Sequence, residues 1–204
     1  MYTNNPYAQG GWSNSANTHS VNDGTWGTLL PQAPTYGALP SSTSGTPPST
    51  LTFYFTEFSP DLLNCVVVGP QSKVYYKVIP GPPGLTYVQK PDNSSILCIE
   101  WQQHPMIEVR EIVPRQAVGQ WMLPAADGKS RIFEVKGRRY VWTAENNFIS
   151  LYSVYPSPSD LNARISNGKP GSIVLEITTN AISAGLLEVA IASVVLLKCG
   201  RNID

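Results

Sequence analysis

The pattern of apolar and polar positions divides the chain near residue 50 and again near residue 180. From Leu51 onward, apolar residues such as Phe53 and Phe55 alternate with more polar neighbours. A period of two is typical of a strand with one buried face. Similar short runs follow at 65–68, 73–79, 85–89, 96–102, 106–113, 118–123, 131–136, 139–143, 148–154, 162–166 and 172–178.

Turn-forming residues separate these runs. Gly69-Pro70, residues 81–84 (GPPG), Asp127-Gly128 and Asn167-Gly168 are examples. Proline fixes φ, glycine permits positive φ, and Asn or Asp bonds its own backbone, so each supports a tight turn. About twelve short strands at this spacing predict an antiparallel sandwich or barrel.

The last apolar run, residues 181–199 (AISAGLLEVAIASVVLLKC), predicts a single helix without a polar face. Thr178, Thr179 and Asn180 offer capping side chains at its start, and Gly200 marks its end. Such a helix is roughly 27 Å long at 1.5 Å per residue. It belongs either in a protein interior or in a bilayer.

Glu188 favours the interior, because an acid near the middle of a membrane helix costs about 2.5 to 3.5 kcal/mol. A buried carboxylate needs a partner. Glu188 is therefore either a residue at the mouth of a barrel or a site acid, and we favour the first. A tail-anchored membrane helix remains the alternative.

These observations together predict a mainly β fold. Closing about twelve antiparallel strands into a barrel hides the sheet edges, and one hydrophobic C-terminal helix fills the lumen. The expected domain spans residues 51–204, with its central helix at 181–199.

Four short motifs add a resemblance: Ile99-Glu100-Trp101, Arg139-Tyr140-Val141-Trp142, Leu151-Tyr152 and Leu175-Glu176-Ile177. With the closing helix, residues 51–199 resemble the tubby-like barrel superfamily, and more narrowly an uncharacterised tubby-like domain family of mushroom-forming fungi. The resemblance implies no catalytic residues. Relatives in the wider superfamily bind membrane lipids, which is an analogy at the level of the fold.

Residues 1–50 form a low-complexity arm rich in Gly, Pro, Ser, Thr and Asn. The arm has no Lys or Arg, and its one acid is Asp23. It lacks hydrophobic periodicity, so we expect it to be disordered or extended. Its aromatic residues fit either a passive linker or a self-associating segment that binds other copies or protein partners: Tyr2, Tyr7, Trp12, Trp26 and Tyr36.

Net charge and cysteine content limit the partners and the cellular compartment that we expect. The net charge is zero, which gives no electrostatic case for nucleic acid as a partner. The three cysteines form no CxxC pair and fit a reducing, cytoplasmic compartment. The N-terminus lacks the basic and apolar regions of a signal peptide.

Signatures of catalysis are missing from the sequence. It has two histidines, and we find no GxSxG, Walker, HExxH or paired CxxC motif. We therefore expect a protein that is not an enzyme, with no catalytic residue, metal or cofactor.

One span is locally basic. Seven of the 14 basic residues lie between Arg110 and Arg139, together with three acids. Lys129, Arg131, Arg138 and Arg139 on adjacent hairpins are candidates for binding a phosphate-bearing headgroup. The alternative is a solvated outer face whose charges protect strand edges.

The sequence therefore supports two functional hypotheses. The first is a non-enzymatic structural or interaction protein, a barrel with a self-association-prone arm. The second is a barrel that binds anionic lipid headgroups as a peripheral membrane protein.

Overall fold

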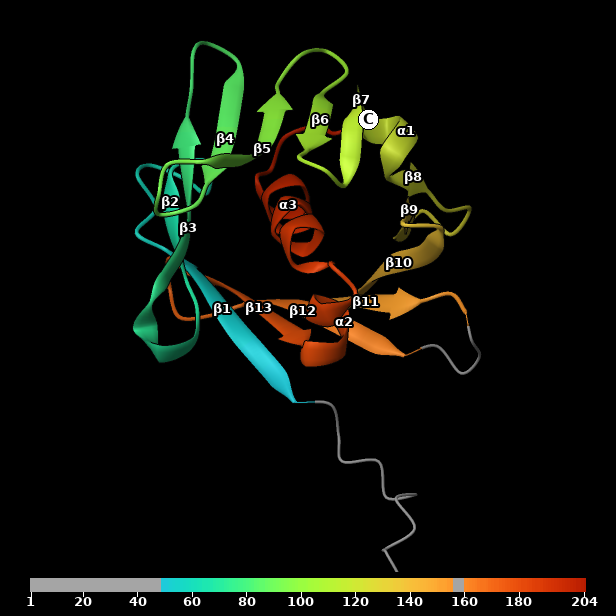
Figure 1. Ribbon diagram of the computed structural model, residues 1–204. Helices are drawn as coiled ribbons and strands as arrows, with labels where there is room; N and C mark the ends of the chain where they lie inside the picture. The colour runs from blue at the N-terminus through green and yellow to red at the C-terminus, as the bar shows by residue number, and fades with distance from the viewer. Residues whose placement is uncertain (1–48, 156–159) are drawn as a thin grey trace, which may run out of the picture. The chain divides into compact units, whose positions relative to one another are not determined.

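The computed structural model describes residues 49–155 and 160–204, so the predicted N-terminal arm, apart from its last two residues, lies outside the described residues. The described chain forms thirteen strands and three α-helices (Figure 1). The strands are β1 (Thr50–Thr56), β2 (Cys65–Val68), β3 (Val74–Pro80), β4 (Leu85–Gln89), β5 (Ser95–Glu100), β6 (Met106–Val109), β7 (Val113–Ala117), β8 (Leu123–Pro124), β9 (Ser130–Val135), β10 (Arg138–Glu145), β11 (Phe148–Ser153), β12 (Leu161–Asn167) and β13 (Ile173–Thr178). The helices are α1 (Val118–Trp121), α2 (Thr179–Ser183) and α3 (Leu187–Lys198).

All thirteen strands belong to one antiparallel sheet, in the order β7-β6-β5-β4-β3-β2-β1-β13-β12-β11-β10-β9-β8. Apart from β7 and β8, strands that are neighbours in the chain pair with each other, and the first strand joins the last, with Phe53 opposite Leu175. The prediction of a mainly β, antiparallel fold is therefore confirmed. Figure 1 shows the sheet curled around α3.

The sheet has two ends where the sequence predicted closure. β7 and β8 are its terminal strands, and no ladder joins them within residues 49–155 and 160–204. The sequence suggested one extended piece at 118–123. Residues 118–121 instead form the single turn of α1, which leaves β8 only two residues long. We call this region, from β7 through α1 to β8 and β9, the seam.

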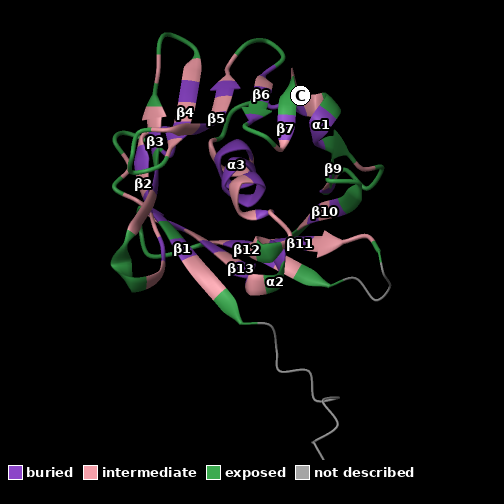
Figure 2. Cartoon of the chain, viewed as in Figure 1, coloured by how far each residue is buried: buried purple, intermediate pink, exposed green. Residues whose placement is uncertain are grey.

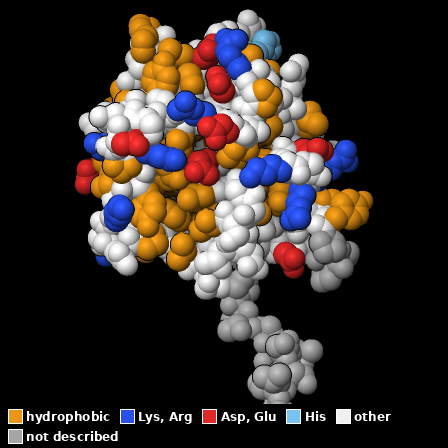
Figure 3. Space-filling model, in the orientation of Figure 1, with side chains coloured by type: hydrophobic (Ala, Val, Ile, Leu, Met, Phe, Trp, Pro, Cys, Tyr) orange, Lys and Arg blue, Asp and Glu red, His pale blue; other side chains and the backbone are white. Residues whose placement is uncertain are grey.

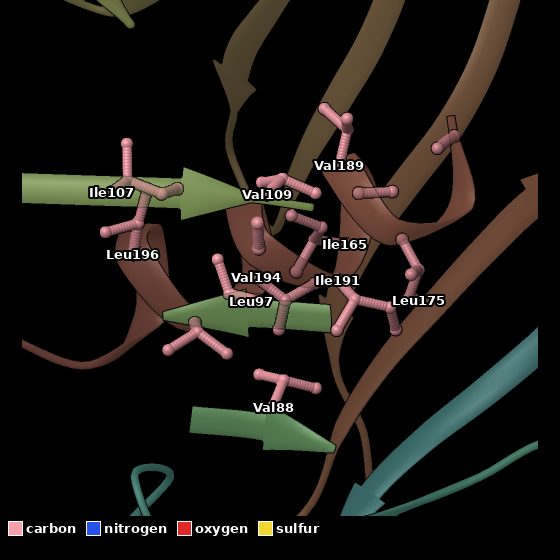
Figure 4. Close-up of a cluster of buried hydrophobic side chains, with 14 of the residues drawn as sticks. Val88, Leu97, Ile107, Val109, Ile165, Leu175, Val189, Ile191, Val194 and Leu196 are labelled. Carbon is pink, nitrogen blue, oxygen red and sulfur yellow. The ribbon is translucent and has the colours of Figure 1, made fainter. Parts of the chain in front are cut away.

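The core lies between the concave face of the sheet and α3 (Figure 2). Val189, Ile191 and Val194 are 0% exposed, so the prediction of a buried core helix is confirmed. Figure 4 shows these side chains among those of β4, β5, β6, β12 and β13. Each fully buried aliphatic side chain contributes about 1.5 to 3 kcal/mol relative to an exposed one.

The predicted single helix at 181–199 is divided in two. Thr178 caps α2, and its hydroxyl accepts a hydrogen bond from the Ala181 N–H at 3.2 Å. Gly185 then adopts φ +82, a left-handed conformation that interrupts the helix before α3 starts. Only glycine reaches this region at little cost, so the break is encoded by one residue inside an apolar run.

Among the described helices, none has the length and apolar character needed to cross a bilayer.

Candidate functional site

Three hairpin turns meet at the end of the sheet where α3 begins. They are residues 90–94 between β4 and β5, 110–112 between β6 and β7, and 136–137 between β9 and β10. Successive turns of an antiparallel sheet alternate between its two ends, so these three share one end. We call them, together with the α2–α3 turn at residues 184–186, the Gly185 rim.

The rim surrounds a cavity of about 350 Å³. Its lining combines basic, acidic and hydroxyl side chains with apolar ones: Lys90, Ser94, Ser95, Ile96, Arg110, Glu111, Ile112, Lys136, Gly185 and Glu188.

Each of the three hairpin turns supplies one basic residue to this cavity, namely Lys90, Arg110 and Lys136. Within the described residues, these three side chains form no ion pair, whereas Arg115, Arg131 and Arg139 do. Cations that converge on one cavity and form no ion pair favour an anionic ligand.

Lys136 is positioned by the backbone on both sides of the cavity. Lys136 and Gly137 have φ values of 50 and 73, which fit the two-residue turn of a tight hairpin. Across the cavity, a Cβ at Gly185 would lie 2.6 Å from the Lys136 Nζ atom. The missing side chain of Gly185 therefore leaves the room that the ammonium group occupies.

Two acids, Glu111 and Glu188, also line the cavity. The Tyr76 hydroxyl donates to Glu188 Oε1 at 3.4 Å, which supplies the partner that a mouth carboxylate needs. Burial, and secondarily the Glu188 charge, raise the pKa of Tyr76, so its hydroxyl stays protonated as a donor. Figure 3 shows basic and acidic side chains interspersed on the viewed face, so the charge there is mixed.

The four residues that the sequence singled out are not brought together. Arg131 binds both carboxylate oxygens of Asp204, at 2.8 and 2.9 Å, and Arg139 lies 3.5 Å from Glu134. Lys129 and Arg138 belong to opposite ends of the β9–β10 hairpin. Only Arg138 follows a turn of the Gly185 rim directly.

Sequence reasoning missed the set of Lys90, Arg110 and Lys136. Arg110 and Lys136 belong to the basic span, but Lys90 precedes it by twenty residues in the chain. What the three basic residues share is their position: each directly follows the last residue of a strand that ends at the Gly185 rim. Recognising it required knowing which hairpins share an end.

A metal site was not expected, and the described ranges contain no group of three or more His, Cys, Asp or Glu side chains suited to one. His104 lies in the exposed turn before β6.

Comparisons with known proteins give little functional information. A family model described as "Family of unknown function (DUF6593)" matches residues 60–202. No curated protein matches the sequence. An X-ray structure of a protein from Arabidopsis thaliana aligns over 72% of this chain and 92% of its own, with 9% identity and a TM-score of 0.37.

Proposed function

Because the chain belongs to this family of unknown function, we propose a role from the Gly185 rim: a non-catalytic module that binds anionic, phosphate-bearing headgroups. In this proposal the protein is cytoplasmic and reaches membranes from their surface. The ligand's negative charge sits between Lys90, Arg110 and Lys136 at the mouth of the curled sheet.

One observation carries the proposal. Three cations from three separate turns line one cavity and have no ion-pair partner in the described chain. The three cations exceed the two acids of the lining, Glu111 and Glu188, by one charge, and an anion in the cavity compensates that excess. Ser94 and Ser95 lie in the same lining; the Ser94 hydroxyl donates to Asp92, whereas the Ser95 hydroxyl accepts from Gln89 and keeps its own proton for a phosphate oxygen.

The expected affinity is modest. A basic residue near an anionic membrane contributes about 1 kcal/mol. Glu111 and Glu188 in the same lining repel a ligand that carries several negative charges. The proposal is thus one of reversible, peripheral binding that strengthens at low salt.

We also propose that the domain is a tubby-like barrel whose seam is closed by other means than strand pairing. The Asp204 carboxylate binds Arg131 of β9, and the Cα atom of Asp204 lies 3.8 Å from a Cβ built at Gly119 of α1. Ile203 is 6% exposed. α1 and the C-terminal residues together support this form of closure.

The headgroup proposal is tested by vesicle flotation of the full-length chain. K90Q/R110Q/K136Q should bind vesicles containing anionic lipid at least about tenfold more weakly than the native chain. Neutral phosphatidylcholine vesicles provide the baseline. Inorganic phosphate and inositol phosphates as competitors distinguish a lipid headgroup from a free phosphate ligand.

The matched control is K129Q/K169Q/K198Q, which removes the same charge from positions outside the Gly185 rim lining. It should retain nearly all binding, apart from a small loss by general electrostatics. A separate R138Q/R139Q variant tests residues that the sequence favoured. Equal loss of binding in the two triple variants would contradict a site at the Gly185 rim.

A further inference from the structure

The seam contains a second cavity, of about 580 Å³. This volume falls within the roughly 300–1,000 Å³ of ordinary ligand pockets. Residues of β7, α1, β8, β9 and β10 line it, together with the turn after β8. Its lining shares no residue with that of the Gly185 rim. A ligand of the seam is therefore independent of the headgroup proposed above.

The cavity lies where the pairing of β8 with β9 stops. The ladder between these strands has two positions, and on the side toward α1 it ends with Leu123 opposite Ile132. Residues 118–121 form α1 and do not lengthen β8. The next residues of β9, Phe133 and Glu134, line the cavity, as do residues of α1. The space thus follows from the change from strand to helix that leaves β8 short.

Much of the cavity lining is apolar. Leu123 is 54% exposed, the highest value among the leucines of the described residues. Trp121 is 5% exposed, and its ring packs against that of Phe133 with the ring centroids 5.5 Å apart. All three residues line the cavity. An aromatic ring suits such a lining, because it packs well against both aromatic and aliphatic side chains.

The charges of the lining compensate each other. Glu134 and Arg139 are its only charged residues, and they lie opposite each other on β9 and β10. Arg139 Nε is 3.5 Å from Glu134 Oε2. An anionic ligand would be repelled by Glu134, and a cationic one by Arg139. The lining therefore favours an uncharged ligand, in contrast to the Gly185 rim.

Two glutamines supply hydrogen-bonding groups to the cavity. The Gln120 amide forms no hydrogen bond within residues 49–155 and 160–204. Gln116 donates from Nε2 to the Pro114 carbonyl at 3.3 Å, whereas its Oε1 accepts no hydrogen bond from any described residue. An amide group has both donors and an acceptor, so these side chains complement a second amide on a ligand.

We propose that the seam binds a small, uncharged aromatic molecule that carries a carboxamide or a similar group. Its ring packs against Trp121 and Leu123. Its amide exchanges hydrogen bonds with the Gln120 amide and donates to Gln116 Oε1. The pair of Glu134 and Arg139 selects against charged analogues of the same size.

The test is an NMR titration of the full-length, ¹⁵N-labelled chain at neutral pH with phenylacetamide, phenylacetate and phenethylammonium. The three probes share one ring and differ in charge. Phenylacetamide should bind with a roughly millimolar dissociation constant, as expected of so small a molecule. It should bind about threefold to fivefold more tightly than either ion. The amide resonances of Gln120 and Leu123 and the indole N–H resonance of Trp121 should shift saturably, and the amide of Ile191 in α3 should not.

Gln120→Leu keeps the size of the side chain and removes its amide. It should weaken phenylacetamide about fivefold to tenfold, the effect of losing one hydrogen bond. Gln103→Leu makes the same change at an exposed position outside the lining and should have no effect. Leu123→Ala should weaken all three probes severalfold, whereas Leu161→Ala, at a leucine 37% exposed and outside the lining, should weaken none.

Three results would overturn the proposal. The first is that no probe causes saturable shifts at Gln120, Leu123 and Trp121. The second is that the amide and the two ions bind equally well, because the seam would then not distinguish charge. The third is that Gln120→Leu and Gln103→Leu bind phenylacetamide equally, because the Gln120 amide would then make no contact with the ligand.

Discussion

Gly185 affects both the backbone before the core helix α3 and the position of a basic side chain at the Gly185 rim. Its φ of +82 ends α2 and lets α3 start in a new direction. Its missing Cβ also leaves space for the Lys136 ammonium group, 2.6 Å from where that atom would be. One glycine therefore affects both stability and the position of a proposed ligand-binding cation.

These two effects can be separated by substitution. Gly185→Ala should lower the free energy of unfolding by about 1 kcal/mol, the cost of a left-handed conformation for a residue with a Cβ. Because Lys136 is flexible, its side chain should move aside and add little to that cost. The same variant should bind anionic vesicles severalfold more weakly. Urea denaturation and flotation measure the two quantities.

Gly171→Ala is the control for this prediction. Gly171 has φ +80, but nothing lies within 4 Å of a Cβ built there. It should lose a similar free energy of unfolding and keep its vesicle binding. If both variants lost binding equally, the contact between Gly185 and Lys136 would have no role in the site.

At the scale of elements, the fold depends on α3 as the shared contact of the curled sheet. Ile191 is 0% exposed, and Figure 4 shows it beside Leu175 and Leu97 of two different strands. Ile191→Ala should lower the free energy of unfolding by about 3 kcal/mol, because the protein loses buried surface and gains a cavity. Chemical denaturation of the full-length chain measures this.

Leu197→Ala, on the same helix but at a half-buried position, is the matched comparison. It should cost less than half as much as Ile191→Ala. Equal losses would indicate that helix propensity, and not burial among the strands, determines the contribution of α3.

Local pattern predicted these elements well, but not how they meet. Alternation from Leu51 reveals strands, and the apolar run after Ala181 reveals a core helix. In both segments the local pattern of apolar residues indicates which side chains are buried. The seam was missed because residues 118–121 are apolar enough for a strand, whereas they form one turn of helix. Likewise, Lys90 joins Arg110 and Lys136 only through the ladder of three hairpins, which no local window contains.

At the scale of the whole described domain, the end of the chain connects α1 to β9 at the seam. Asp204 binds the Arg131 guanidinium through both oxygens, and Arg131 also donates to the Met122 carbonyl at 3.2 Å. Since Met122 directly follows α1 and Arg131 lies on β9, this group holds the end of α1 against β9. The contact is partly exposed, so its strength depends on solvent and charge state.

This contact should make stability depend on pH. The hydrogen bond from Arg131 lowers the pKa of Asp204 below its ordinary value. A lowered folded-state pKa contributes stability above the unfolded-state pKa, about 3.9, and loses it as pH falls through the folded value. Asp204→Asn removes this contribution. The Asp204 side chain is 56% exposed, so screening limits it to roughly 0.5 kcal/mol.

The difference in free energy of unfolding between the native chain and D204N should therefore be largest near neutral pH. It should shrink below about pH 4 and diminish in high salt. Urea denaturation across a pH series measures it, with Glu57→Gln, an exposed acid without an ion pair in the described chain, as the control. A difference independent of pH would mean that packing of residue 204, and not its charge, holds the seam.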